Sequence, residues 1–137
     1  MLKIGTHNSG TGEKSSGLLS WLVAPFSICQ SKTLVEQYKA GCRYFDLRIK
    51  ECKGKLYLAH GLWRSKYDIY KILREFFGHV NDKVYLMVTY EGQGHTDELN
   101  QFYEWLKWDY PCAVVTSLNI KKPEWKCIRS LNNIPVE

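Results

Sequence analysis

The sequence has no hydrophobic run long enough to cross a membrane. Its longest apolar stretch, from Leu18 to Cys29, is interrupted by Ser20, Pro25 and Ser27, whereas a spanning helix needs roughly 20 apolar residues. We therefore expect no membrane-crossing segment. The first residues also lack the basic and apolar regions of a secretory signal. Localisation thus stays open between a cytoplasmic protein and one secreted by a leader outside this sequence.

Paired cysteines and cysteine motifs for metal binding are missing too. The five cysteines are odd in number and show no CxxC spacing, which argues against a fully paired disulfide framework and against a zinc ribbon. The sequence also contains no internal repeat and no low-complexity segment. We expect reduced, mostly buried thiols at Cys29, Cys42, Cys52, Cys112 and Cys127.

The composition that remains is typical of one globular domain spanning residues 1–137. Of these 137 residues, 45% are hydrophobic and 24% charged, which fits neither disorder nor a coiled coil. The net charge of +5 suits an anionic partner such as a phosphate ester, an acidic lipid surface or a nucleic acid. It is equally consistent with a role in solubility alone.

Hydrophobic periodicity predicts strands that alternate with helices. A helix is expected from Ser31 to Gly41, another begins after Asp68 as N-cap and ends at Gly78, and a third spans 96–108. Alternating strands and helices indicate a parallel sheet covered by helices, an α/β fold. The tail from Ser117 is predicted to be a loop with one short helix. The predicted strands are 3–6, 43–49, 55–60, 83–90 and 113–116.

Two aromatic segments allow more than one interpretation. Residues 18–26 predict either a short buried helix or an amphipathic helix at a membrane interface, with Trp21 as the membrane contact. If Trp21→Ala left binding to anionic vesicles unchanged, the segment would belong to the core. The aromatic residues from Tyr103 to Tyr110 are expected to pack against the sheet and not to stack on nucleic acid.

Polar side chains that suit catalysis follow or end three of the predicted strands. The first is followed by His7 and Asn8, the second carries Asp46 and Arg48 on one face, and the third ends in His60. Each feature alone has a structural explanation, such as a buried histidine or a simple salt bridge. Because functional residues of parallel α/β proteins gather at the C-terminal strand ends, their joint occurrence predicts a site.

Two histidines and an arginine match the needs of phosphodiester cleavage. A guanidinium can neutralise the phosphate through bidentate hydrogen bonds. One neutral histidine can take the proton of the attacking hydroxyl, and one charged histidine can protonate the leaving oxygen. His7, Arg48 and His60 would supply these three roles without a metal.

The same residues resemble the phosphatidylinositol-specific phospholipase C family, in particular the X-domain of its bacterial calcium-independent members. The matching segments are Gly5 to Thr11, Leu34 to Arg48 and Leu58 to Gly61, in the family's order and spacing. They cover about the first 60 residues well, and Val84 to Tyr90 matches less distinctively. The resemblance therefore concerns the N-terminal half of the domain.

The resemblance implies an incomplete TIM-type barrel containing about the first five strands. His7 would be the general base toward the inositol 2-hydroxyl and His60 the general acid toward the diacylglycerol oxygen. Arg48 would bind the phosphate, with Asn8 and Asp46 supporting the site. The expected products are diacylglycerol and a cyclic inositol phosphate, which is hydrolysed more slowly.

The resemblance also disfavours calcium, so we expect no metal and no other cofactor. Asn8 stands where calcium-dependent members bind the metal, but those enzymes have a carboxylate at the position of Arg48. A guanidinium there occupies the place and charge of the ion. If calcium did bind, Glu91 would be the expected additional ligand.

Three functional hypotheses remain at this point, and each implies a phosphodiester or headgroup as partner. The leading one is a phosphodiesterase acting at a membrane surface on phosphatidylinositol or a similar lipid. The second is a non-catalytic relative that binds inositol phosphate headgroups or a partner, and the third acts on a glycerophosphodiester. Because a complete barrel takes about 250 residues, the sequence further predicts self-association or pairing with a second half-barrel chain.

Overall fold

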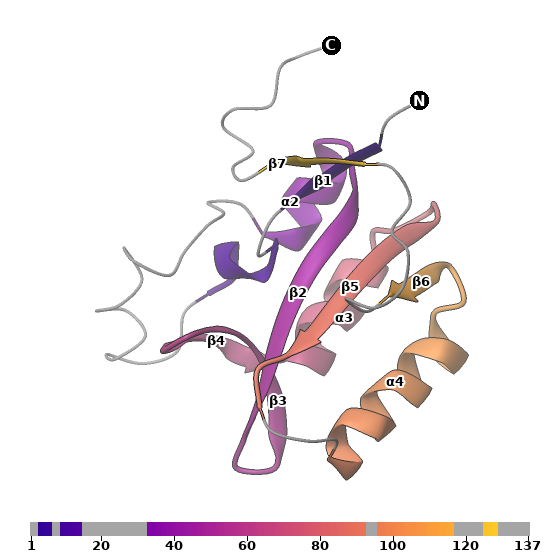
Figure 1. The fold of residues 1–137 in the computed structure, drawn as a ribbon. Helices are drawn as coiled ribbons and strands as arrows, with labels where there is room; N and C mark the ends of the chain where they lie inside the picture. Colours follow the sequence, from indigo (N-terminus) through magenta and orange to yellow (C-terminus); the bar gives the residue numbers. More distant parts are fainter. Residues whose placement is uncertain (1–2, 7–8, 15–32, 93–95, 117–124, 129–137) are drawn as a thin grey trace.

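The computed structural model describes residues 3–6, 9–14, 33–92, 96–116 and 125–128 (Figure 1). Strands and helices alternate through most of this part of the chain. The elements are β1 (Lys3–Thr6), the 3₁₀ helix η1 (Ser9–Gly12), α2 (Leu34–Lys39), β2 (Cys42–Cys52), β3 (Lys55–His60), β4 (Trp63–Asp68), α3 (Ile69–Phe77), β5 (Val84–Tyr90), α4 (Asp97–Asp109), β6 (Ala113–Thr116) and β7 (Trp125–Ile128).

Helix α3 forms where its apolar spacing and its cap predict it. The side chain of Asp68 accepts a hydrogen bond from Lys71 N at 2.9 Å, which satisfies one of the free amides at the helix start. Gly78 follows the last helical residue. The apolar face is buried as expected, at Ile69, Ile72, Leu73, Phe76 and Phe77.

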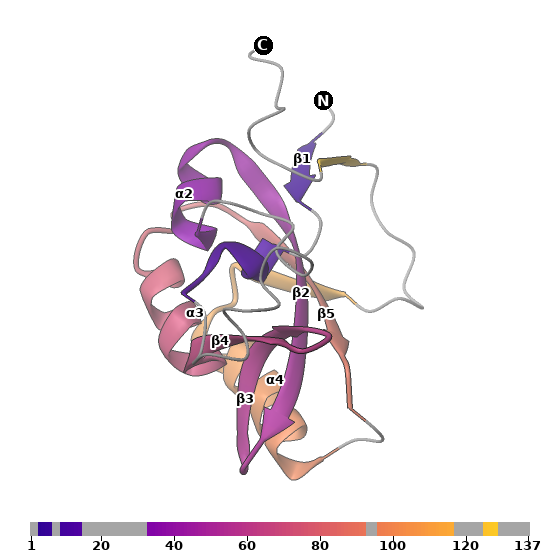
Figure 2. The same ribbon diagram turned by 90° about the vertical axis from the view of Figure 1, so that its left-hand side faces the viewer.

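Five strands run parallel in the order β7, β1, β2, β5, β6. Helices α2 and α3 lie on one side of β2 and β5 (Figure 2). Phe45 of β2 packs edge-on against Phe76 of α3, with ring centroids 5.1 Å apart. The α/β fold with about five parallel strands is therefore confirmed, although the strand set differs from the predicted one.

The first difference is the direction of β3, which the sequence analysis placed in the parallel sheet. Strand β3 pairs antiparallel with β2, because the two are joined by a turn at Lys53 and Gly54 with φ values of 52° and 77°. A parallel neighbour needs a crossover of a dozen or more residues, which a two-residue turn cannot provide. A second turn at Gly61 and Leu62 then adds β4, which was not predicted and pairs antiparallel with β3.

The second difference lies in the C-terminal tail. We predicted a loop with one short helix, but Trp125–Ile128 forms β7 and pairs parallel with β1. This pairing joins residues more than 100 positions apart in the sequence, so no local periodicity reveals it. The other residues after Thr116 lie outside the described part of the chain.

The core lies between the sheet and the helices, and aromatic side chains supply much of it. Phe77 stacks on Tyr110 with ring centroids 4.1 Å apart, and Trp105 meets Tyr110 edge-on at 5.0 Å. The expected packing of the aromatic residues around α4 is confirmed, except that Trp108 is 72% exposed. Among the described helices, none is both long and apolar enough to cross a membrane.

Candidate active site

Strands β1 and β3 both pair with the same edge of β2 and leave a gap between them. Strand β1 pairs with β2 up to Phe45, and β3 pairs with the same strand from Ile49 onward in the opposite direction. Both lie on the edge away from β5, because β5 also pairs with Phe45 and with Ile49. In Figure 1, β1 approaches β2 from above and β3 from below. Between their ends lie Asp46, Leu47 and Arg48 of β2.

A segment after β1 supports the backbone at this gap. The Ser9 hydroxyl accepts a hydrogen bond from Asp46 N at 2.8 Å, so a side chain replaces the missing strand partner. Gln37 of α2 in turn donates its amide to Ser9 O at 2.7 Å. Ser9, Gln37 and Asp46 are all buried. The gap in the strand pairing is thus fixed by hydrogen bonds to η1.

Asp46 and Arg48 form an ion pair on the face of β2 opposite the helices. The distance from Arg48 Nη2 to Asp46 Oδ2 is 3.6 Å, and the Arg48 side chain remains 32% exposed. Arg48 Nε is buried and has no hydrogen-bond acceptor within the described part of the chain. A guanidinium held by a carboxylate, with a buried donor still to be satisfied, is suited to binding an anion.

His60 reaches the same edge of β2 from the other side. It lies two residues beyond Leu58, which pairs with Ile49, so β3 carries it back toward the middle of β2. A tight turn follows, in which Gly61 has φ +61° and His60 pairs with Trp63 of β4. The β3–β4 turn thus holds His60 at the end of a strand paired on both sides, and its position does not depend on a parallel crossover.

The residues after η1 are tied to α2 and to β4. The Glu13 carboxylate accepts a hydrogen bond from Leu34 N at 2.8 Å, and Lys14 O accepts one from Lys66 N at 2.6 Å. Burial raises the pKa of Glu13, and nearby Glu75 adds to the rise. These contacts hold residues 9–14 against the gap from three directions.

An aromatic pair lies next to Asp46 and Arg48 on the same face of β2. Tyr44, two residues before Asp46, stacks on Tyr85 of β5 with centroids 4.5 Å apart. Burial raises the pKa of the Tyr44 hydroxyl, so it stays protonated over the pH range of most assays. The ring pair, in which Tyr44 is buried, therefore packs the part of β2 that lies next to the Asp46–Arg48 ion pair.

The structure brings together some of the predicted site residues and leaves others undescribed. Asp46 and Arg48 are in contact, and His60 lies on the strand that converges on them. His7, Asn8 and Trp21 lie outside the described residues. Their flanks are described, however: Thr6 pairs with Phe45, and Ser9 binds Asp46 N. The sequence positions of His7 and Asn8 therefore fall between two residues fixed at the gap.

Two contributors were missed at the sequence level. Ser9 was included only within the Gly5–Thr11 segment of the family resemblance, without a role of its own, although it holds Asp46 N. Lys50 was not considered, yet its ammonium donates to Gly61 O at 3.2 Å, directly after His60. The alternation of β2 places Lys50 on the face of Asp46 and Arg48, and this signal was available in the sequence.

Of the residues considered for calcium, Glu91 lies within the described part of the chain and Asn8 does not. Glu91 is exposed, and its backbone amide donates to Ile49 O at 2.8 Å. Among the described residues, no three His, Cys, Asp or Glu side chains lie close enough to hold a metal ion. Cys42, Cys52 and Cys112 are free thiols, of which Cys42 is buried and the other two are partly buried. Burial raises the pKa of Cys42 to about 11.

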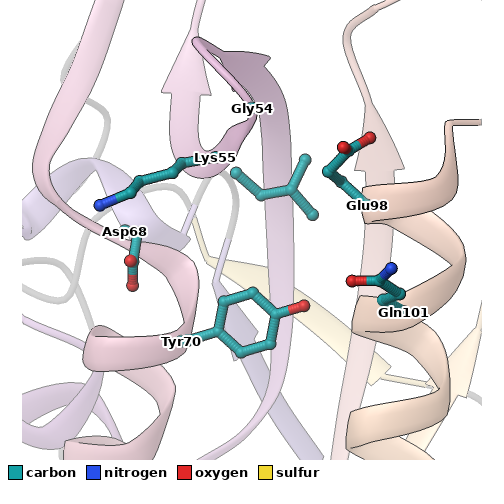
Figure 3. Close-up of a pocket in the computed structure, with 7 residues that line it drawn as sticks. Gly54, Lys55, Asp68, Tyr70, Glu98 and Gln101 are labelled. Carbon is teal, nitrogen blue, oxygen red and sulfur yellow. The ribbon is translucent and has the colours of Figure 1, made fainter.

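A cavity of about 200 Å³ lies apart from these residues (Figure 3). It is formed by the β2–β3 turn, the start of α3 and the first turns of α4. The side chains of Glu98 and Gln101 face Tyr70 across it. None of Asp46, Arg48 and His60 lines this cavity. The lining residues are Gly54, Lys55, Leu56, Asp68, Tyr70, Glu98 and Gln101.

Comparison with known proteins gives one sequence relative and several solved structures. No family model matches the chain. A PI-PLC X-box domain-containing protein of Dictyostelium discoideum is 31% identical over 64 residues, which are 47% of this chain and 8% of that protein. The chain thus spans a small part of this relative.

The solved structures are of phosphatidylinositol-specific phospholipase C from Staphylococcus aureus. One, from work on modulation of that enzyme's membrane binding, has a TM-score of 0.56 at 18% identity, covering 79% of this chain and 38% of the enzyme. A variant that incorporates pentafluoro-Phe has a TM-score of 0.61 at 16% identity, covering 85% and 47%. The chain spans less than half of that enzyme. The chain is thus similar in sequence to part of a PI-PLC X-box domain-containing protein, and its fold is similar to part of the fold of a phosphatidylinositol-specific phospholipase C.

Proposed function

We propose that the protein cleaves phosphatidylinositol or a similar phosphodiester by acid-base catalysis without a metal ion. The convergence of β1 and β3 on the Asp46–Arg48 pair is the observation that supports this most directly. His60 ends β3, and His7 directly follows β1 in the sequence; the proposal places both imidazoles at this one guanidinium. The relationship to phosphatidylinositol-specific phospholipases C points to the same substrate class.

Arg48 would bind the phosphate. Its Nε donor is buried without an acceptor among the described residues, and a phosphate oxygen would satisfy it. Asp46, at 3.6 Å, would hold the guanidinium plane toward the substrate. The cation would then neutralise the charge that develops on the phosphoryl oxygens as the new bond forms.

The two histidines would share the proton transfer. His7, neutral, would take the proton of the inositol 2-hydroxyl as that oxygen attacks phosphorus. His60, protonated, would give a proton to the diacylglycerol oxygen as its bond to phosphorus breaks. The products are diacylglycerol and a cyclic inositol phosphate. The slower hydrolysis of the cyclic ester would use the same groups in reversed roles.

Phosphorus NMR of phosphatidylinositol incubated with the protein and EDTA tests this proposal. We expect a cyclic phosphodiester signal that disappears in His7→Ala and in His60→Ala. His79→Ala is the matched control, because His79 is exposed and lies in the turn after α3. Circular dichroism of each variant separates loss of chemistry from loss of the fold.

Three outcomes would overturn parts of the proposal. Turnover that EDTA abolishes would show that Arg48 does not replace a metal ion. Retained turnover in His60→Ala would remove the general acid from β3. A folded protein that binds a soluble inositol phosphodiester without turnover would favour the headgroup-binding hypothesis.

A further inference from the structure

Charge is distributed unevenly along the described chain. Residues 42–68, which form β2, β3 and β4, contain seven Lys and Arg but three Asp and Glu. Residues 69–116, which include α3, β5, α4 and β6, contain four Lys and Arg but seven Asp and Glu. The segment that carries Arg48 and His60 is thus basic, and the segment that follows it is acidic. An anionic surface will orient such a molecule with β2–β4 toward itself.

A rigid turn at the edge of this basic segment exposes a leucine. The β3–β4 turn has two central residues, Gly61 and Leu62, and only Gly61 has positive φ among them. This pattern fits a two-residue hairpin turn with glycine first. Leu62 is 63% exposed, although it lies between His60 and the fully buried Trp63. The turn therefore presents one apolar side chain to solvent beside the candidate site.

One cation contacts the turn that carries this leucine, and two more follow it along β4. The Lys50 ammonium donates to Gly61 O at 3.2 Å, which places it on the turn itself. Strand β4 is an edge of the sheet, with β3 as its neighbour. Along it, Arg64 lies 4.1 Å over the Tyr57 ring, and Lys66 is exposed. We call Leu62 with Lys50, Arg64 and Lys66 the basic turn surface.

We propose that the basic turn surface docks the protein on an anionic phospholipid membrane. Leu62 would enter the boundary between headgroups and acyl chains, while the three cations contact lipid phosphates. The combination of an exposed apolar side chain with flanking cations is typical of reversible interfacial binding. The cations alone would suit an acidic protein as well as an anionic membrane. A single leucine, however, offers little apolar area to a protein interface, which favours the lipid surface.

Docking through this turn also has a consequence for the reaction, and this part rests on the proposed function. Leu62 is two residues from His60 on a turn paired by backbone hydrogen bonds. A membrane contact at Leu62 would therefore bring the proton donor to the depth at which a diacylglycerol oxygen lies. The lipid would need little displacement from the bilayer before cleavage.

Vesicle sedimentation tests the docking without turnover. We would compare vesicles of phosphatidylcholine alone with vesicles that also contain phosphatidylglycerol, an anionic lipid without inositol. The full chain should bind the second kind preferentially. Leu62→Ala should weaken this binding by roughly tenfold, because most of the apolar side chain that enters the interface is lost. Lys66→Glu should weaken it by roughly tenfold or more, because each basic residue near such a surface contributes about 1 kcal/mol and the new charge is repelled.

Two control variants make the same chemical changes on α4, within the acidic segment 69–116. Trp108→Ala removes another exposed apolar side chain, and Lys107→Glu reverses another exposed lysine, both on α4. Neither should change vesicle binding. Equal weakening by the controls, or unchanged binding of Leu62→Ala and Lys66→Glu, would overturn the proposal. A protein that binds these vesicles but shows no turnover would contradict the proposed function and leave the docking surface standing.

Discussion

The β2–β4 unit and the layer of α3 and α4 both bury large apolar side chains, but only the first also carries charged and exposed groups of the candidate site. In the helical layer, large side chains such as Phe76, Phe102 and Leu106 are almost fully buried, and capping residues start the helices. The β2–β4 unit instead keeps a half-buried arginine, an ion pair and an exposed leucine around its turns. The helical layer therefore serves the core, whereas the β2–β4 unit contributes both to the core, with Trp63 and Phe45, and to the candidate site. Substitutions should separate stability from activity.

The largest expected effect on stability comes from Phe102→Ala. Phe102 is fully buried in α4 and meets Tyr70 edge-on at 5.9 Å. Removing the ring should lower the unfolding free energy by about 3–5 kcal/mol, because a cavity remains. Urea denaturation followed by fluorescence measures the change. Trp108→Ala on the same helix should cost less than about 1 kcal/mol, because Trp108 is exposed.

The comparison would fail if these two variants behaved alike. It would also fail if Phe102→Ala reduced turnover at a temperature where the variant is fully folded. Either result would mean that α4 acts on the site and does not serve only the core.

Arg48→Lys should have the opposite effect to Phe102→Ala, with a large loss of activity and little loss of stability. Lysine keeps the positive charge but loses the planar fork, so kcat/KM should fall about 100-fold with little change in stability. Arg43→Lys is the matched control on the same strand. Arg43 forms its ion pair with Asp82 at 3.0 Å, at the other end of β2. We expect a small loss of stability and unchanged kcat/KM. Equal kinetic losses in both variants would contradict phosphate binding by Arg48.

Two turn glycines allow a comparison within the β2–β4 unit. Gly54 and Gly61 both have positive φ, at +77° and +61°, and an added Cβ would meet no atom within 4 Å at either position. Each change to alanine should therefore cost about 1 kcal/mol through backbone strain alone. Only Gly61→Ala should also reduce kcat, by about tenfold, because His60 precedes this turn. Melting curves measure the loss of stability, and initial rates at saturating substrate measure kcat. A fall in kcat for Gly54→Ala of the same size would remove the special role of the β3–β4 turn.

Local sequence signals predicted the helical layer well. The Asp68 cap, the apolar spacing of α3 and the glycine after it are all found in the structure. The Asp46–Arg48 contact was also predictable, because alternation places residues i and i+2 on one face. Such features depend on residues a few positions apart, so a single sequence contains them.

The direction of β3 and the pairing of strands distant in sequence were harder to predict from the sequence. The two-residue turn at Lys53 and Gly54 implies an antiparallel β3, whereas the alternation of strands and helices, on which the parallel sheet was predicted, does not carry this signal. Strand β7 was missed because its partner β1 is distant in sequence. The support of Asp46 N by Ser9 also crosses the fold, over 37 residues. The site was thus predictable in its residue types and not in the way the strands bring them together.

The smallest expected effect concerns Glu13, which ties the residues after η1 to α2. Its carboxylate accepts from Leu34 N, and burial followed by repulsion from Glu75 and Glu36 raises its pKa above the ordinary 4.5. A raised carboxyl pKa means that the native state favours the protonated form. Its stabilising contribution is therefore complete below pH 4.5 and is lost as the pH rises through the folded pKa.

Glu13→Gln keeps an acceptor oxygen for Leu34 N but removes the buried charge. The variant should be slightly more stable than the wild type at neutral pH, and the difference should vanish in acid. Urea denaturation as a function of pH measures it. Glu75→Gln, which removes only the repulsion from an exposed neighbour, should give a smaller gain in the same pH range. A Glu13→Gln variant that is less stable at neutral pH would show that the charge itself holds residues 9–14 on α2, and that desolvation is the weaker of the two effects.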